Sequence, residues 1–246
     1  MPELTPAFFA YVCTAVFLAG IVRGATGFGF SMIMIVLLTL VLPPAVAATV
    51  ILMWEILASV GHLPFVYRQV NWKALRWLAL GVLVGTPAGV LFLVHMPIAP
   101  MKICINLTVL LLTIPLLRGM RPSKAPSCTA TTAVGLLSGV INGASANGGP
   151  PVILFFLSGP GGVGVSRASL IAFFLFTDVW ASLIYWQQGL VTWSTVRFAV
   201  LFLIPLALGI WVGSKCFTRM NEQVLRKIVL ILLIAVTSVA LLHSLL

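Results

Sequence analysis

The sequence predicts an all-α polytopic membrane protein made of two inverted repeats. Apolar residues make up 61% of the chain and charged residues 7%, and the mean hydropathy is +1.18. A soluble globular protein carries about 25% charged residues, so this chain has too little polar surface to cover a globule in water. Ten apolar segments fall five to each half, and one glycine-rich signature occurs in both halves. We therefore expect each repeat to be a broken or re-entrant helix pair followed by three transmembrane helices.

The apolar segments place the first repeat at residues 1–120 and the second at 128–246, joined by a short basic linker at 118–127. Segments of 18 to 22 residues can cross a hydrocarbon core of about 30 Å at about 1.5 Å per residue. The segments flanking each glycine-rich signature are shorter, and the sequence leaves open whether they cross the bilayer or re-enter. The segments are 6–22, 28–42, 45–62, 73–94, 99–117, 128–142, 149–159, 165–186, 193–214 and 223–244.

The glycine-rich signature recurs 119 positions further along the chain and interrupts an apolar stretch each time. Backbone groups freed from helical hydrogen bonds at membrane depth are tolerated only where protein or a water-filled cavity satisfies them. Two such breaks at corresponding places of two halves are typical of a transporter's central site. The matched positions are Gly20 and Gly139, Gly24 and Gly143, Ala25 and Ala144, Thr26 and Ser145, and Gly29 and Gly148.

The basic residues favour an odd number of membrane reversals in each half. With that parity, eleven of the 14 basic residues fall on one side, Lys102 and Arg197 fall opposite, and Arg23 lies inside the first break. Positive residues are enriched in cytoplasmic loops, so this face is predicted to be cytoplasmic, with both termini outside. The same parity inverts one repeat relative to the other. The eleven are Arg68, Lys73, Arg76, Arg118, Arg121, Lys124, Arg167, Lys215, Arg219, Arg226 and Lys227.

Glu55 and Asp178 are two of only four acidic residues, and both lie near the centres of apolar segments at matching repeat positions. An ionised carboxylate at the centre of a membrane costs about 2.5 to 3.5 kcal/mol on insertion scales. Such a carboxyl is expected to take up and release a proton, as the coupling residue of a transporter must. The alternative is a neutral or paired carboxyl that ties two helices together, and Arg23 is a candidate partner for either.

The chemistry of both breaks fits a small anion. Hydroxyl and amide side chains offer neutral donors, glycines let backbone N–H groups come close, and a restarting helix presents the positive end of its dipole. The alternative is helix packing, because glycine and serine are common where membrane helices approach each other. The predicted substrate-binding residues are Arg23, Thr26, Gly27, Phe28, Gly29, Ser31, Asn142, Ser145, Asn147, Gly148 and Gly149, with Glu55 and Asp178 as proton-coupling residues.

The other residue patterns indicate no metal site, redox pair or nucleic-acid surface. The cysteines lack Cys-x-x-Cys spacing, the histidines lack ligand spacing, and no basic stripe carries interleaved aromatics. We therefore expect no cofactor, no metal and no nucleic-acid partner. The first residues lack the basic region of a signal peptide, so we expect the N-terminus to be retained. Aromatic residues near segment ends are interpreted as interface anchors, namely Tyr67, Trp72, Tyr185, Trp186 and Trp193.

The first glycine-rich signature, its second copy Asn142-Gly-Ala-Ser-Ala-Asn-Gly-Gly-Pro-Pro151 and the two-repeat length resemble the TauE/SafE family of sulfite and organosulfonate exporters. The resemblance covers essentially the whole chain. It implies a secondary transporter of small anions, often sulfur-containing ones such as sulfite or sulfoacetate, in the cytoplasmic membrane of a prokaryote. Many members carry consecutive glycines in the first motif, whereas this chain has Gly27-Phe28-Gly29-Phe30. Two phenyl rings are therefore expected to narrow or line the site.

Three other classes stay open beside the proton-coupled transporter. A passive anion channel would use the same breaks without needing Glu55 and Asp178 to titrate. A membrane-embedded enzyme would need an activated nucleophile, and Ser145 has no histidine at a suggestive spacing. An assembly subunit would carry no substrate flux of its own. The sequence is also compatible with a homo-oligomer.

Reporter cysteines test the predicted topology. In a chain freed of its own cysteines, Ser123→Cys and Asn221→Cys should both react with an impermeant thiol reagent only from the cytoplasmic side, because both lie in basic loops. Gln188→Cys lies in an opposite loop and should react only from outside, which makes it the control. Labelling of Ser123→Cys and Asn221→Cys from opposite sides would contradict the odd number of reversals.

Overall fold

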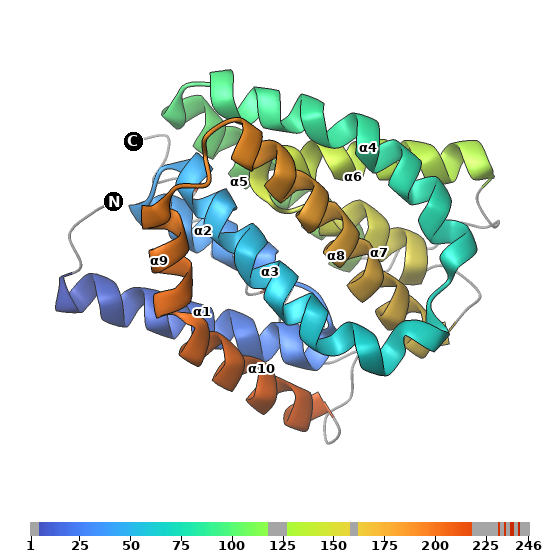
Figure 1. Cartoon of the computed structure of the whole chain (residues 1–246), viewed down its shortest axis with the longest axis horizontal. Coiled ribbons are helices and arrows are strands. Elements are labelled where there is room, and N and C mark those ends of the chain that lie inside the picture. The colour runs from blue at the N-terminus through green and yellow to red at the C-terminus, as the bar shows by residue number, and fades with distance from the viewer. Residues whose placement is uncertain are drawn as a thin grey trace.

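The computed structural model describes residues 5–117, 127–157 and 162–217, together with positions 231, 234, 237, 238 and 241. Every regular element within these residues is a helix, which confirms the predicted all-helical class (Figure 1). The first half contains α1 (Pro6–Thr26), α2 (Phe30–Val41), α3 (Pro44–Val66), the 3-10 turn η1 (Tyr67–Gln69), α4 (Trp72–His95) and α5 (Ile98–Leu117). The second half contains α6 (Cys128–Ser145), α7 (Gly149–Leu157), α8 (Gly162–Gln187), α9 (Trp193–Leu201) and α10 (Leu203–Phe217).

Four helical stretches in the described residues are long and apolar enough to cross a membrane: α1, α3 with η1, α4, and α8 from residue 164 onward. Helices α9 and α10 add a fifth crossing if the pair, which is bent by 45°, counts as one span. The sequence predicted one continuous segment at 193–214. The structure interrupts it at Phe202, where the backbone leaves the helical region with φ −103° and ψ 14°. With its apolar composition, the chain is a multi-pass membrane protein.

Several predicted features lie outside the described residues. These are most of the linker, the last apolar segment at 223–244 apart from the isolated positions, and the basic residues Arg118, Arg121, Lys124, Arg219, Arg226 and Lys227. The fifth helix of the second repeat, and the relation of the two repeats as inverted copies, therefore stay predictions.

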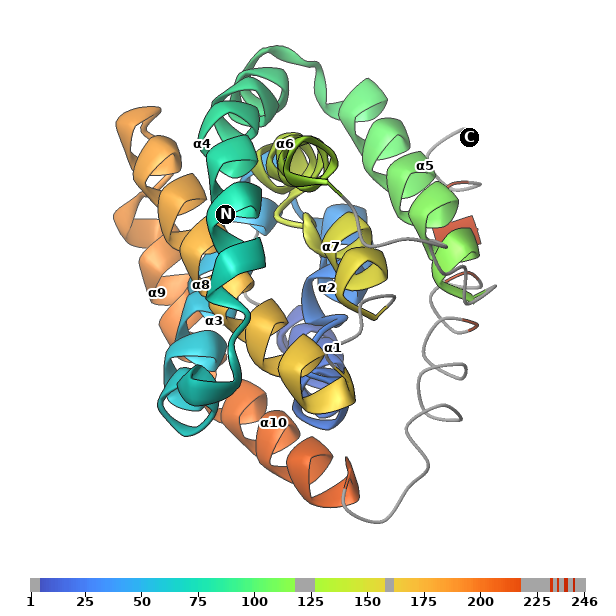
Figure 2. The same cartoon turned by 90° about the vertical axis from the view of Figure 1, so that its right-hand side faces the viewer.

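The short helices α2 and α7 lie at the centre of the bundle, among the longer helices (Figure 2). Helix α2 is buried from Phe30 through Val36. The Tyr11 hydroxyl of α1 donates to the Leu37 carbonyl of α2 at 2.9 Å, which fixes the two arms of the first pair to each other. Because the breaks precede α2 and α7, they lie inside the protein and not against lipid.

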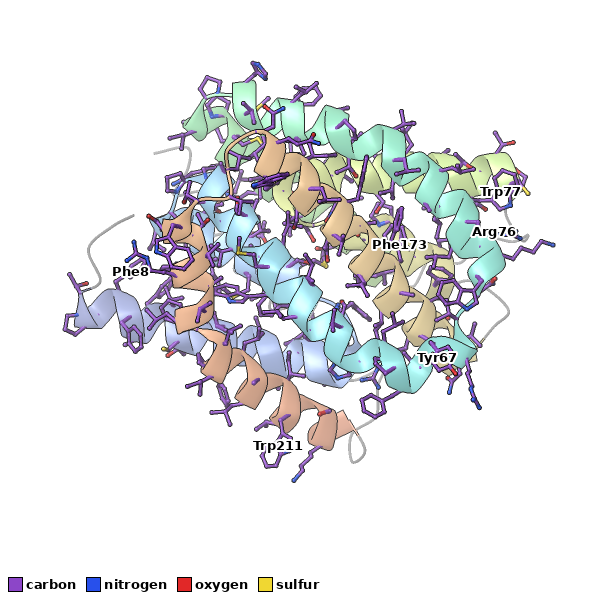
Figure 3. All side chains as sticks on the ribbon, in the orientation of Figure 1. Phe8, Tyr67, Arg76, Trp77, Phe173 and Trp211 are labelled. Carbon is purple, nitrogen blue, oxygen red and sulfur yellow. The ribbon has the colours of Figure 1, made fainter. Side chains whose placement is uncertain are left out.

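The long helices run in both directions between the two ends of the molecule. Tyr67 and Arg76 lie together at one end and Phe8 at the other (Figure 3). The start of α8 lies at the same end as the start of α4, and α9 starts at the same end as α1 (Figure 1). Helices α4 and α8 therefore begin at one end of the molecule, and α1 and α9 at the other.

Glycines spaced by four residues let two pairs of helices pack backbone against backbone. An added Cβ at these glycines would press against backbone atoms of the partner helix. Membrane helices associate through such small-residue contacts because lipid offers no hydrophobic drive to bring them together. Helix α4 packs on α6 through Gly81, Gly85, Gly89, Gly135, Gly139 and Gly143, and α1 packs on α10 through Gly20, Gly24, Gly209 and Gly213.

This packing corrects the extent of the predicted breaks. Gly20 and Gly24 lie within α1, and Gly139 and Gly143 lie within α6, so their interpretation as part of the interruptions is wrong. They occupy close helix crossings, which was the alternative reading of the signature. The helical hydrogen bonding is interrupted only from residue 27 in the first copy and from residue 146 in the second.

Gly89→Ala should destabilise the protein by about 1 to 3 kcal/mol, the usual range for overpacking. Its Cβ would collide with the Val140 carbonyl oxygen and lie 2.8 Å from the Ala144 nitrogen. Gly61→Ala is the matched control in α3, because a Cβ there meets nothing within 4 Å. Thermal unfolding in detergent micelles measures both. Equal melting temperatures for the two variants would contradict the close α4–α6 contact.

Candidate functional site

The first break is a left-handed turn between α1 and α2. Gly27 and Gly29 have φ angles of 81° and 88°, which glycine adopts without the steric cost that a side chain adds. Arg23 lies in the last turn of α1 and not inside the break as predicted. Its Nη1 donates to the Gly27 carbonyl at 2.9 Å, and Thr26 Oγ1 lies 2.8 Å from the Phe28 carbonyl oxygen. The Arg23 side chain thus satisfies a carbonyl group freed by the turn.

Arg23 and Glu55 form a buried ion pair between α1 and α3. Arg23 Nη2 lies 2.9 Å from Glu55 Oε2, and both side chains are 4% exposed. The same nitrogen donates to Ser59 Oγ at 2.8 Å, and the guanidinium carbon lies 5.1 Å from the centre of the Phe174 ring on α8. Glu55 Oε1 accepts the backbone N–H of Ser31, in the first turn of α2, at 3.2 Å. The predicted pairing of Arg23 with one of the two acids is confirmed for Glu55.

The second break lies between α6 and α7 and begins at Ala146. This is the one residue other than glycine in the described ranges with a positive φ, at 53°. Asn142 Oδ1 accepts the Gly148 N–H at 3.1 Å, and Ser138 Oγ donates to the Gly148 carbonyl. Both backbone groups of Gly148 are therefore satisfied by side chains from α6.

Asn142 also holds the second carboxylate. Its Nδ2 donates to Asp178 Oδ1 at 3.0 Å, and Thr177 Oγ1 lies 3.5 Å from the same oxygen. Asp178 is 3% exposed. Arg23 and Asn142 occupy equivalent positions of the repeated signature. The two matched acids are thus bound by matched residues, one cationic and one neutral.

Helix α8 donates to both broken helices. Near its start, Arg167 Nη2 donates to the Gly24 carbonyl at 3.0 Å, and near its end Tyr185 Oη donates to the Gly143 carbonyl at 2.9 Å. These carbonyls lie in the last turns of α1 and α6, where helical partners are missing. Tyr185 is 0% exposed, so its interpretation as an interface anchor is wrong.

The sequence missed three residues that surround the breaks. Arg167 entered the sequence prediction only as a basic residue that indicates topology. A lone basic residue in an apolar segment also indicates a polar partner inside the protein. Ser138 and Phe174 carry no local pattern that separates them from packing residues. Their roles depend on which helix lies opposite, and spacing along one helix does not contain that information.

The predicted substrate-binding side chains differ in whether their polar groups already form hydrogen bonds within the protein. The Thr26 hydroxyl lies 2.8 Å from the Val22 carbonyl oxygen, and Ser145 donates to the Ile141 carbonyl at 2.9 Å, each within its own helix. Asn147 is 0% exposed, and neither its amide oxygen nor its amide nitrogen has a protein partner. A buried polar group without a partner costs about 1 to 3 kcal/mol. Asn147 is therefore the break residue whose surroundings are best suited to a ligand.

The remaining predicted residues shape the two breaks. A Cβ at Gly148 would lie 2.6 Å from the Ser138 carbonyl oxygen, and one at Gly149 would lie 3.3 Å from the Phe174 ring. Both glycines therefore let the start of α7 approach its neighbours closely. Phe28 is buried at 4% exposure within the apolar core.

The described residues contain no cluster of three or more His, Cys, Asp or Glu side chains that could hold a metal ion. A crevice of about 250 Å³ runs between α3 and α8, the two helices that carry the acids. Its lining is apolar except for Thr49, Ser182 and Tyr185. An anion would lose its hydration there and find only the Ser182 hydroxyl as a buried group without a partner, so the crevice is poorly suited to an anion.

Comparison with known families identifies the chain. The model of the family described as sulfite exporter TauE/SafE matches residues 12–240, a range that contains both breaks and both buried acids. The chain belongs to the TauE/SafE family. TauE/SafE proteins are membrane transporters, so this chain is a transporter and not an enzyme. The resemblance noted in the sequence is confirmed. Searches of curated proteins and of solved structures gave no match.

Breaking the buried ion pair should destabilise this TauE/SafE protein strongly. Arg23→Gln and Glu55→Gln should each lower the free energy of unfolding by about 3 to 5 kcal/mol, because each leaves an unpaired charge in the interior. The double variant should lose less than the sum of the two. Chemical denaturation in detergent measures these values, with exposed Arg68→Gln as the control that should change little. Additive losses would contradict the pairing.

Proposed function

We propose that this TauE/SafE member is a secondary transporter of a small sulfur-containing anion, sulfite or a small organosulfonate. The substrate binds between the two helix breaks, and its transport is coupled to protons. The protein lies in the cytoplasmic membrane of a prokaryote, with its basic loops in the cytoplasm. Membership of a transporter family supports the transport activity. The buried polar groups at both breaks support the position of the site.

The observation that carries this proposal is the unpartnered amide of Asn147. It follows Ala146 directly at the second break, is fully buried, and offers one donor group and one acceptor atom. The backbone contributes less here than a helix start usually does. Pro150 and Pro151 in the first turn of α7 have no N–H, which removes two of the donors that a helix N-terminus otherwise presents. A side chain must therefore supply much of the recognition at this break.

The helix contacts support a relation between the two predicted repeats. Helix α4 of the first half packs along α6, which opens the second half, and α10 packs along α1, which opens the first. Such a reciprocal exchange is what a two-fold relation between inverted repeats produces. It brings both breaks into the interior of one bundle, so that a single substrate contacts both halves.

Flux into proteoliposomes tests the function directly. The purified chain should transport sulfite or a small sulfonate and discriminate against carboxylates of similar size. An imposed pH gradient should change the rate if protons are coupled. Single-channel currents would instead identify a channel, because a channel passes far more ions per second than a carrier. Absence of flux for every anion would refute the proposed transport activity.

Asn147→Ala should raise the half-saturating substrate concentration by about ten- to a hundredfold. A hydrogen bond to a charged group contributes about 1.5 to 3 kcal/mol, which corresponds to that ratio. Asn106→Ala is the matched control, because Asn106 is 2% exposed on α5 and its amide oxygen also lacks a partner. Equal effects of the two variants would contradict a binding role specific to the second break.

Loss of the hydroxyl groups at the breaks is expected to matter less than loss of the amide. Thr26→Val and Ser145→Ala should raise the same concentration by a smaller factor, because both hydroxyls already bond within their own helices. Thr113→Val removes an equivalent hydroxyl that donates to the Val109 carbonyl in α5 and serves as their control. Gly148→Leu should abolish flux, since its side chain would collide with α6.

A further inference from the structure

The two matched acids have different partners. Glu55 contacts the guanidinium of Arg23 at 2.9 Å and accepts the N–H of Ser31 at 3.2 Å. Asp178 accepts a neutral donor, the amide of Asn142 at 3.0 Å, and the hydroxyl oxygen of Thr177, whose closer acceptor is the Phe174 carbonyl at 3.1 Å, lies 3.5 Å away. The repeats thus place one acid in an ion pair and the other in a neutral hydrogen-bond network.

Because of this difference, adding a proton to Glu55 and adding one to Asp178 have different energetic consequences. A proton on Glu55 would dissolve the ion pair and leave Arg23 as an unpaired buried cation, which is strongly unfavourable. A proton on Asp178 breaks no ionic contact of its own. It also removes one of the two negative charges that are buried on the packed helices α3 and α8. A proton on Asp178 therefore makes the charge of this region more positive by one unit while the Arg23–Glu55 ion pair stays intact.

We propose that Asp178 carries the coupled proton and that Glu55 stays ionised as a positioning residue. Glu55 fixes the Arg23 guanidinium, whose other nitrogen holds the Gly27 carbonyl at the first break. The carboxylate of Asp178 takes up one proton to become a carboxylic acid. Release of one proton later returns it to the carboxylate. The proposal rests on the proposed anion transport and assigns unequal roles to the two matched acids.

The other titratable groups around α8 leave Asp178 as the group that changes charge. On α8 itself, Tyr185 donates to the Gly143 carbonyl, and Arg167 lies eleven residues away, about 16 Å along the helix. On α3, His62 bonds the Ala58 carbonyl, seven residues beyond Glu55. The titratable groups on η1 and α4 are all exposed, namely Tyr67, Arg68, Lys73, Arg76 and His95.

Charge balance then links the proton to the substrate. Protonation of Asp178 removes one negative charge from the buried region, so an anion meets less repulsion there than when Asp178 is ionised. By linkage, anion and proton favour the same state of the protein and bind together. Anion affinity should therefore fall as pH rises, by up to about tenfold per pH unit for one linked proton.

The test measures binding of radiolabelled methanesulfonate to the full chain in lipid nanodiscs, from mildly acidic to mildly alkaline pH. A sulfonate keeps its single charge over this range, so any pH dependence belongs to the protein. The wild type should bind more weakly at higher pH. Asp178→Asn should bind at alkaline pH as tightly as the wild type binds at acidic pH, and Asp178→Glu should restore the pH dependence. Glu55→Gln should change the affinity and keep the pH dependence.

The outcomes separate this inference from the transport proposal. The assignment is overturned if Asp178→Asn keeps the wild-type pH dependence of binding, or if Glu55→Gln loses it. Neither result contradicts the proposed sulfite transport, which the flux measurement tests separately. Tight binding by Asp178→Asn at alkaline pH supports it, because misfolding does not produce a gain of affinity. If Asp178→Asn does not fold, the double variant Arg23→Gln/Glu55→Gln, which removes the ion pair without leaving an unpaired charge, decides between the two acids by the same measurement. A wild type that transports sulfite and binds methanesulfonate with no pH dependence also overturns the assignment.

Discussion

Every backbone polar group that leaves a helix inside a bilayer must find a partner within the protein, and the two breaks of this chain are built around that constraint. The side chains that meet it also bind the buried acids. Arg23 holds the first turn and Glu55 together, and Asn142 holds the second turn and Asp178 together. Turn and carboxylate therefore form one unit in each half. A displacement of either break would disturb its acid, which is a direct structural connection between the proposed substrate site and the proposed proton site.

Close helix packing holds these units in position. In a bilayer the hydrophobic effect does not bring helices together, so van der Waals contact between small residues must do it. The first part of each glycine-rich signature serves this purpose, since Gly24 faces the Ile210 and Ser214 backbone and Gly143 faces that of Thr86. Its last part forms the turn. One short motif thus fixes the depth of each broken helix and then ends it.

The helical class, the order of the elements, the place of both turns and the Arg23 partnership could be predicted from the sequence. These features depend on composition, local conformational preference or the scarcity of buried charges. The close helix crossings and the burial of Tyr185 could not be predicted, because they depend on which helix packs against the residue in the folded protein. A glycine at a helix crossing has the same local spacing as one at a turn, and Tyr185 near a segment end has the pattern of an interface anchor. The bend at Phe202 does have a local signal, because Pro205 lies three residues further on and has no N–H to bond the Leu201 carbonyl, although the apolar composition of 193–214 predicts one continuous segment.

The matched positions show how two related halves come to do different work. Arg23 corresponds to Asn142, and Phe28 corresponds to Asn147, so the first half contributes a charge and an apolar ring where the second contributes two amides. If both halves carried the arginine, two ion pairs would hold both acids ionised, and neither would exchange a proton easily. If both carried the amide, neither acid would be in contact with the guanidinium that now pairs with Glu55. The unequal pair gives one acid a cationic partner and the other a neutral one, and the proposed coupling to a single proton requires no more than that.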